Sequence, residues 1–200
     1  MKIQNVVLKL IKPCVIESTF LDDVLKEVTL IQSFRHINIM SIIGVVPYED
    51  TVGIVMELAA CDLEKYIYLQ LPKVLETIDH STFGKLNIFL QCCKGIQWVH
   101  DKFNIAHNNL KPTNFLLTPN GVIKISDFNL AREGKSDIKS CEGTPLYSAP
   151  ETFEKDGKTH GKEVDVYSMG VVLWEMLYEK KPFNEYYNSS MGAINFYAAI

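Results

Sequence analysis

The sequence predicts an α+β fold with two lobes, a small lobe built on a β-sheet with one helix and a second lobe that is mainly helical. Residues 1–58 carry apolar, β-branched runs of strand character around a single helical pattern. Residues 59–200 carry mostly helical patterns. The 200 residues suffice for one core or two small lobes, so we expect a single domain that divides near residue 58.

The first lobe is predicted element by element. Val6–Ile11 is an apolar run with one lysine and predicts a strand. A sequence typical of a helix N-terminus follows at 19–22. Behind it, apolar residues recur at helical spacing at Phe20, Val24, Val28 and Ile31. Residues 42–46 and 52–56 predict a hairpin, with a turn at 47–50.

The second lobe contains two strong helical patterns. A long helix is expected from about Thr82 to Asp101. Its apolar stripe is formed by Phe89, Cys92, Cys93, Ile96 and Val99. A last helix is expected around 165–176, with acidic residues at its start and 180–182 closing it.

Shorter elements lie between these two helices. Phe115–Leu117 and residues 122–125 predict a short hairpin across Pro119-Asn120-Gly121. Residues 132–139 are polar and predict a loop.

Composition argues against several classes of function. The formal net charge of −4 gives no electrostatic reason to expect a nucleic acid or an anionic membrane as partner. The five cysteines form no Cys-x-x-Cys pair and suit reduced thiols. Lys9 interrupts the only early apolar run, so no secretory signal is expected, and the apolar stretch 169–177 is too short to span a bilayer. The expected compartment is the cytoplasm.

Three short sequences in the second half carry chemistry. His107-Asn108-Asn109-Leu110-Lys111-Pro112-Thr113-Asn114 is followed 13 positions later by Asp127-Phe128-Asn129, and then by Ala149-Pro150-Glu151. In order and spacing they resemble the signature set of eukaryotic-type protein kinases, His-Arg-Asp-Leu-Lys-Pro-x-Asn, Asp-Phe-Gly and Ala-Pro-Glu. The segment 165–175 resembles the form found in tyrosine-kinase-like serine/threonine kinases. The resemblance covers nearly the whole chain, beginning at the third strand of that fold.

The resemblance implies a site for ATP and Mg²⁺. Phosphoryl transfer requires neutralised phosphates and a nucleophile held in line. Asp127 and Asn114 would supply oxygen ligands to Mg²⁺. Lys9, held by Glu27, would clamp the inner phosphates, and Lys111 would face the transferred group.

The resemblance also implies an adenine slot. Met56 occupies the gatekeeper position at its back. The backbone C=O of Glu57 and the N–H of Ala59 would meet the adenine edge, and Leu116 would lie beneath the ring. Val7 stands where the family usually has alanine, and its extra methyl groups are expected to crowd the ring.

The chain departs from the family pattern at the positions that act on the substrate. Asn109 replaces the aspartate that accepts the proton of the substrate hydroxyl, and an amide cannot accept that proton. Asn108 replaces the arginine that pairs with a phosphorylated activation loop. Asn129 replaces the glycine of Asp-Phe-Gly, although asparagine tolerates positive φ. No Gly-x-Gly-x-x-Gly lid precedes the first strand, and the helices that follow the last predicted one in the family, with the arginine that pairs with Glu151, are not encoded.

Three interpretations follow. The first is an inactive or impaired kinase domain, a pseudokinase, that acts as a binding or scaffolding module for a protein partner and binds Mg-ATP weakly. The second is an active serine/threonine kinase whose sequence record is incomplete. The third is a decayed fragment that needs a partner to cover the two lobes. Asn109 favours the first over the second.

Overall fold

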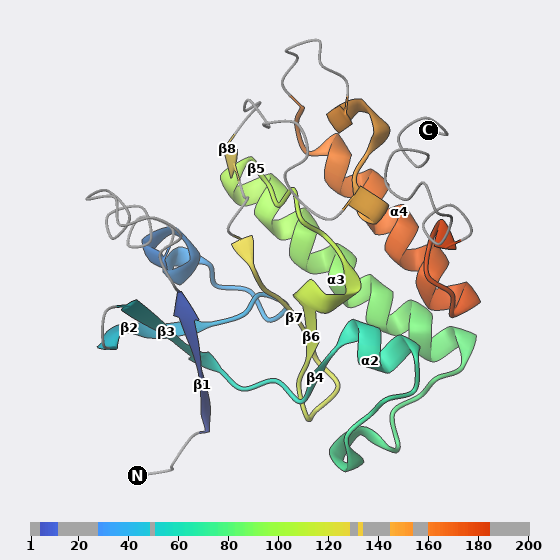
Figure 1. Ribbon diagram of the computed structural model, residues 1–200, viewed down its shortest axis with the longest axis horizontal. Helices are drawn as coiled ribbons and strands as arrows, with labels where there is room; N and C mark the ends of the chain where they lie inside the picture. The colour runs from blue at the N-terminus through green and yellow to red at the C-terminus, as the bar shows by residue number, and fades with distance from the viewer. Residues whose placement is uncertain are drawn as a thin grey trace.

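The computed structural model describes residues 5–11, 28–48, 51–128, 132–133, 145–153 and 160–184 of the chain. The predicted α+β arrangement is confirmed, with a three-stranded sheet on one side and the two long helices on the other (Figure 1). The chain leaves this sheet after Glu57 and enters the helical lobe.

The sheet of the first lobe contains the three predicted strands, β1 (Val6–Ile11), β2 (Ile42–Tyr48) and β3 (Thr51–Glu57). They are antiparallel in the order β1-β3-β2, so β3 lies in the centre and Lys9 stands opposite Ile54. Both strands of the predicted hairpin are therefore confirmed, and Lys9 is fixed on a strand at the edge of the sheet in the described part of the chain.

The turn predicted at 47–50 was placed too early. Pro47 and Tyr48 belong to β2 and pair with Val52 and Thr51 of β3. Proline is accepted there because β2 is the other edge strand, where a missing N–H need not break the sheet. Residues 49–50 lie outside the described part.

The helix predicted behind Phe20 is described only at its end. Residues 28–33 are helical, and Val28 and Ile31 are buried as their spacing predicted. Val28 packs under the sheet with Ile54, so the helix and the sheet share a small core. The N-terminal sequence at 19–22 lies outside the described residues.

The second lobe is built around α3 (Thr82–Phe103) and α4 (Glu163–Tyr178). Its shorter elements are β4 (Cys61–Asp62), α2 (Leu63–Ile67), η1 (Lys73–Leu75), β5 (Ile105–Ala106), η2 (Pro112–Asn114), β6 (Phe115–Leu117), β7 (Ile123–Ile125), β8 (Arg132–Glu133), η4 (Pro145–Tyr147) and η5 (Pro150–Phe153). Strands β4, β6 and β7 form a second sheet, and β5 pairs with β8. The prediction of a loop over 132–139 was therefore wrong at 132–133, and residues 134–139 are not described.

The predicted helices begin and end close to where their capping residues place them. Ser81 Oγ accepts a hydrogen bond from Gly84 N at 3.1 Å at the start of α3. The last helical residue of α3, Phe103, lies two residues beyond the predicted end, and Asn104 caps the helix in the left-handed conformation, φ 53°. Glu179 ends α4 in the same way and pairs with Lys85 of α3. This contact ties the C-terminus of one helix to the first turn of the other.

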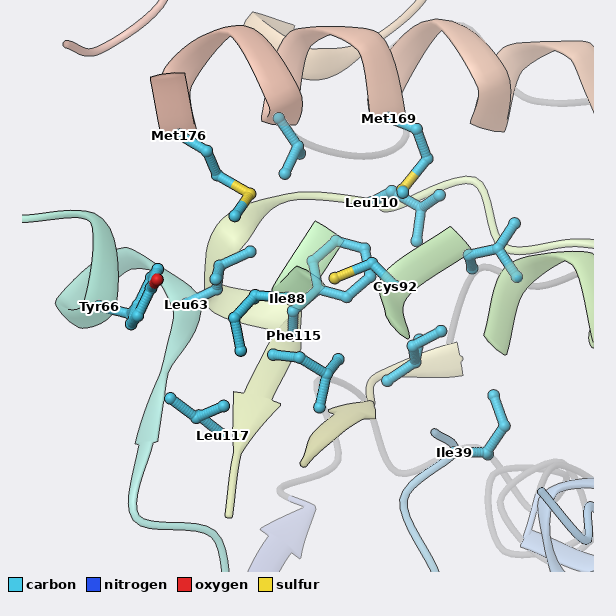
Figure 2. Close-up of a cluster of buried hydrophobic side chains, with 14 of the residues drawn as sticks. Ile39, Leu63, Tyr66, Ile88, Cys92, Leu110, Phe115, Leu117, Met169 and Met176 are labelled. Carbon is cyan, nitrogen blue, oxygen red and sulfur yellow. The ribbon is translucent and has the colours of Figure 1, made fainter. Parts of the chain in front are cut away.

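One hydrophobic core joins the elements of the second lobe. Figure 2 shows Met169 and Met176 of α4 pointing towards Leu110, Cys92 and the ring of Phe115. All five side chains are buried. The loop at 107–114 and the β6–β7 hairpin are thus packed against α3 and α4, and this packing supports the candidate site. None of the helices that the structure describes has the length and apolar character needed to cross a membrane.

A charged cluster is buried beside this core. The Glu175 carboxylate of α4 is fully buried and accepts hydrogen bonds from Tyr147 Oη at 2.7 Å and Tyr68 Oη at 2.8 Å. Lys181 Nζ lies 3.1 Å from the same carboxylate and also pairs with Glu64. Burial, and then the hydrogen bond to Glu175, raise the pKa of both tyrosines. One carboxylate therefore connects α2, η4, α4 and the segment after α4.

Candidate active site

A cavity of about 290 Å³ lies between the first sheet and the β6–β7 hairpin. Four residues predicted for a nucleotide site line it, Lys9, Met56, Leu116 and Asp127, together with Val7 of the predicted adenine slot. They come from strands β1, β3 and β6 and from the segment after β7, so the fold brings together residues that are up to 118 positions apart. We call this space the front cavity.

Lys9 and Asp127 meet directly across the front cavity. Lys9 Nζ donates to Asp127 Oδ1 at 2.6 Å, and the two side chains are 41% and 26% exposed. The sequence predicted Glu27 as the partner of Lys9, but Glu27 lies outside the described residues. Because the pair is partly exposed, its charges remain accessible to a ligand that carries both phosphate and metal.

Asn109 is held by three hydrogen bonds in the loop beside Asp127. Its backbone N–H donates to His107 Nδ1 at 3.3 Å, and its backbone oxygen accepts from Asn114 Nδ2 at 2.7 Å. Its side-chain Nδ2 donates to Asp127 Oδ2 at 3.4 Å, while Oδ1 is buried without a hydrogen-bond partner among the described residues. The Asn109 side chain therefore points its Nδ2 donor towards the Asp127 carboxylate, and its Oδ1 acceptor makes no hydrogen bond to the described residues.

Asn114 connects the loop at 107–114 to the strand that carries Asp127. Its side chain is buried, and its backbone oxygen accepts from Ser126 N at 2.9 Å and Ser126 Oγ at 3.1 Å. Lys111 lies just before η2, and its backbone oxygen accepts from Asn114 N at 2.9 Å. Asn114 is thus fixed on both sides, with its amide nitrogen already used by Asn109.

Two residues of the site adopt a backbone conformation that most side chains avoid. Asp127 has φ 65° and Asn108 has φ 63°. Asparagine and aspartate accept this left-handed region more readily than other non-glycine residues. Such residues persist where the surroundings determine them, and they gather at functional sites. At this site the hydrogen bonds of Asn109 and Lys9 hold Asp127 in place.

A buried carboxylate of α4 supports the loop from behind. Asp165 accepts the backbone N–H groups of His107 at 2.7 Å and Asn108 at 2.9 Å, and His100 Nε2 lies 2.7 Å from it. From the sequence, Asp165 was expected only to open the last helix and to complete the kinase-like segment. Its carboxylate instead points inward, where it fixes the two residues before Asn109.

His107 links this support to the neighbourhood of Asp127. Its ring is fully buried, 4.6 Å from the ring of Phe128 between centroids. Nε2 lies 3.0 Å from the Ser126 carbonyl, which can only accept, so Nε2 carries the proton and Nδ1 accepts from Asn109 N. Burial lowers the pKa of His107 below its ordinary value of 6.5, which keeps the ring neutral.

Acid is therefore expected to destabilise the fold through His107. Because the folded pKa lies below the unfolded value of 6.5, the stabilisation is present above that value and is lost as the pH falls below it. We expect wild type to lose more of its free energy of unfolding than His107→Gln between pH 7.5 and 5.0, because only wild type must protonate a buried imidazole. Urea unfolding followed by circular dichroism measures the difference. An equal loss in both proteins would show that His107 is not protonated on unfolding.

The other predicted site residues lie close to the front cavity without lining it. Glu57 ends β3 next to Met56, and its carboxylate faces away, towards Lys124. Ala59 lies in the crossover to the second lobe, where Ala60 N donates to Leu117 O at 2.7 Å. Asn109 and Asn114 do not line the cavity, but each is hydrogen-bonded to a residue that does, Asn109 to Asp127 and Asn114 to Ser126.

Sequence reasoning missed most of the apolar lining. The front cavity is also lined by Ile31, Met40, Ile42, Ile54, Ser126 and Phe128. Of these, Phe128 stood next to a predicted metal ligand and Ile31 on a predicted helical stripe, which were the available signals. Ile42 and Ile54 lie on strands, and strand alternation alone does not show which face borders a cavity. Met40 and Ser126 lie just outside strands, where the sequence carries no signal.

The donor set fits ATP with Mg²⁺. Asp127 offers a carboxylate and Asn114 an amide oxygen, which are ligands that Mg²⁺ accepts. Lys9 adds a cation at the same point, and the apolar walls around Met56 and Leu116 suit a flat base. The residues present therefore fit both parts of the ligand that the sequence implied.

Comparisons with known proteins agree with this geometry. The model of the protein kinase domain family matches residues 2–198. Relatives include the dual specificity protein kinase shkB of Dictyostelium discoideum, 32% identical over 93% of this chain and 28% of its own length. Another is the serine/threonine-protein kinase STY46 of Arabidopsis thaliana, 33% identical over 96% of this chain and 32% of its own length. The chain thus spans about a third or less of these relatives.

Solved structures show the same fold. A chain in the crystal structure of the yeast RNA Pol II CTD kinase CTDK-1 complex superposes with a TM-score of 0.76 at 27% sequence identity. The match covers 98% of this chain and 60% of that one.

Proposed function

Since this chain belongs to the protein kinase domain family, we propose that it is a nucleotide-binding kinase domain with impaired phosphoryl transfer, which serves as a binding module for a protein partner. One observation carries the proposal: the site keeps an intact contact between a cation and a carboxylate, but holds a neutral amide where the family has a catalytic aspartate. Lys9 meets Asp127 across the front cavity, whereas the catalytic position holds Asn109. The charged groups that would bind a nucleotide are retained, whereas the carboxylate that would accept the substrate proton is replaced by an amide.

The residues of this chain divide the work of binding. Lys9 would hold the inner phosphates, and Asp127 with Asn114 would hold Mg²⁺. The metal, when bound, would neutralise phosphate charge. Val7, Met56 and Leu116 would enclose the base. Each of these roles is electrostatic or steric and needs no proton transfer, so the substitution at position 109 leaves them in place.

Asn109 limits the chemical step. A serine or threonine hydroxyl must give up its proton as it attacks the transferred phosphoryl group, and an amide oxygen cannot hold that proton. The Asn109 amide could at most orient a hydroxyl by a hydrogen bond, and its Oδ1 is buried in this structure. Loss of a general base costs on the order of 10²- to 10⁴-fold in rate.

An active serine/threonine kinase is the second candidate. Its support is that the curated relatives carry the names of protein kinases, and that Lys9, Asn114 and Asp127 keep the positions that phosphoryl transfer requires. The two candidates share nucleotide binding and differ in whether phosphate is transferred.

Nucleotide binding is tested by calorimetric titration with ATP, with and without Mg²⁺. We expect weak, metal-assisted binding with a Kd at or above the order of 100 μM, because Val7 narrows the base slot. Lys9→Ala and Asp127→Ala should each remove the signal. Lys181→Ala, which breaks an ion pair away from the front cavity, is the matched control and should retain it. Tight binding that ignores Mg²⁺ and survives both site variants would place the nucleotide elsewhere.

A further inference from the structure

A second cavity lies on the other side of the chain segments that line the front cavity. Along β3, Met56 lines the front cavity, and the next residue, Glu57, lines a separate cavity of about 440 Å³ behind it. Along the β7 segment, Ser126 lines the front cavity and Lys124 lines the one behind. Successive residues of extended chain point to opposite faces, so Met56 and Glu57 place the two cavities on opposite sides of the end of β3. The segment 124–126 borders both cavities as well, and we call it, together with the end of β3, the partition between them.

Glu57 and Lys124 are joined on the rear face of this partition. Lys124 Nζ lies 3.0 Å from Glu57 Oε1, and the side chains are 12% and 20% exposed. The same oxygen accepts from Ser41 N at 2.8 Å, and Glu57 N donates to Ser41 O at 3.2 Å. The pair is thus well enclosed and is supported by a backbone contact that fixes the carboxylate.

The ion pair crosses from one sheet to the other. Glu57 ends the central strand of the first sheet, while Lys124 lies on β7 of the second sheet. Two backbone hydrogen bonds nearby join the segment before β2 to β7, Met40 N to Ile125 O at 2.9 Å and Ile125 N to Asn38 O at 2.8 Å. Met56 and Leu116 both line the front cavity, and they belong to the first and the second sheet. The separation of the two sheets at this cavity is therefore tied to contacts on the rear face.

We propose that Lys124 is a positioning residue, which through its ion pair with Glu57 holds the two walls of the front cavity at the separation that a nucleotide base requires. The proposal rests on the proposed nucleotide binding of the front cavity. Lys124 touches no part of that cavity itself. It acts by fixing Glu57, the last residue of β3 before the crossover, relative to the second sheet.

If the two walls of the front cavity are already held at the right separation, less conformational entropy is lost when a nucleotide binds. With the ion pair broken, the segment before β2 remains joined to β7 through Asn38, Met40 and Ile125, but the end of β3 loses its ion pair with β7. We therefore expect Lys124→Met to weaken ATP binding by about 3- to 10-fold relative to wild type. Lys124→Arg keeps the charge and is expected to stay within about twofold of wild type.

Hydrogen exchange of the free protein tests the same point without a nucleotide. The amides of Met40, Ser41 and Ile125 are expected to exchange at least about tenfold faster in Lys124→Met, and near the wild-type rate in Lys124→Arg. Lys181→Met is the matched control, because it breaks an ion pair in the helical lobe. It is expected to leave these three amides unchanged relative to the rest of the first lobe.

The outcomes separate the two proposals. If wild type bound no ATP, the proposed function would fail, and the exchange rates alone would decide the role of Lys124. Unchanged exchange in Lys124→Met, or acceleration spread evenly over the protein, would overturn it. Where wild type binds ATP, an unaltered Kd in Lys124→Met would also overturn it, even if the exchange became faster.

Discussion

Replacing Glu175 with leucine is expected to lower the free energy of unfolding by about 3–5 kcal/mol. The carboxylate is fully buried and accepts from the hydroxyls of Tyr68 and Tyr147, and Lys181 lies beside it. Leucine fills a similar volume but leaves the hydroxyls of the buried Tyr147 and the partly buried Tyr68 without this acceptor, at a cost of about 1–3 kcal/mol for a buried donor and less for a partly buried one. Since small domains are stable by about 5–15 kcal/mol, much of the total would be lost.

The matched control is Glu64→Gln. Glu64 pairs with the same lysine, but its side chain is 38% exposed, so its loss is expected to cost less than about 1 kcal/mol. Urea unfolding of wild type and the two variants, followed by circular dichroism, gives the comparison. Equal effects of the two substitutions would mean that the buried carboxylate has no special role in holding η4 against α4.

Restoring an aspartate at position 109 is expected to raise phosphoryl transfer by less than about 10³-fold. In this chain the Asn109 amide donates to Asp127 Oδ2 at 3.4 Å. Asn109→Asp replaces that donor with a second carboxylate, and two neighbouring carboxylates raise each other's pKa unless a cation lies between them. Asn108 also stands where many kinases carry an arginine that pairs with a phosphorylated activation loop, so the base would return without that arginine.

Single-turnover transfer from radiolabelled ATP to a serine-containing protein measures this effect at several Mg²⁺ concentrations. Asn109→Asp is expected to require more Mg²⁺ than wild type for nucleotide binding, because the metal must now offset two carboxylates. The matched variant Asn109→Ser removes the amide without adding charge and should show no increase in metal requirement. A gain of 10³-fold or more would show that position 109 alone limits activity.

The parts of the fold that depend on local pattern could be predicted from the sequence. Strands β1 and β3 and helices α3 and α4 follow from apolar periodicity, although α3 runs two residues past its predicted end. The order of the three short sequences was enough to place Asp127 and Asn114 near each other. The turn at 47–50 was misplaced because proline is a turn signal in sequence yet is accepted on an edge strand.

The contacts between distant elements could not be predicted, because they depend on how the elements pack. The direct contact of Lys9 with Asp127 joins residues 118 positions apart. Asp165 looked like an acidic residue at a helix start, and only packing shows its carboxylate turned towards the backbone of His107. The same holds for the pair of Glu57 and Lys124, since each looks like an ordinary charged residue of a strand.

We propose that this kinase domain retains its nucleotide site and, with Asn109 in place of the base, has lost most of its catalysis. The most direct measurement is the rate of phosphate transfer by the purified wild-type protein, with Mg²⁺ and saturating ATP, beside Asp127→Ala. Ordinary protein kinases turn over at about 1–100 s⁻¹. We predict that wild type is slower by at least about 10²-fold and differs little from Asp127→Ala. A wild-type rate within tenfold of ordinary kinases that Asp127→Ala abolishes would contradict the account.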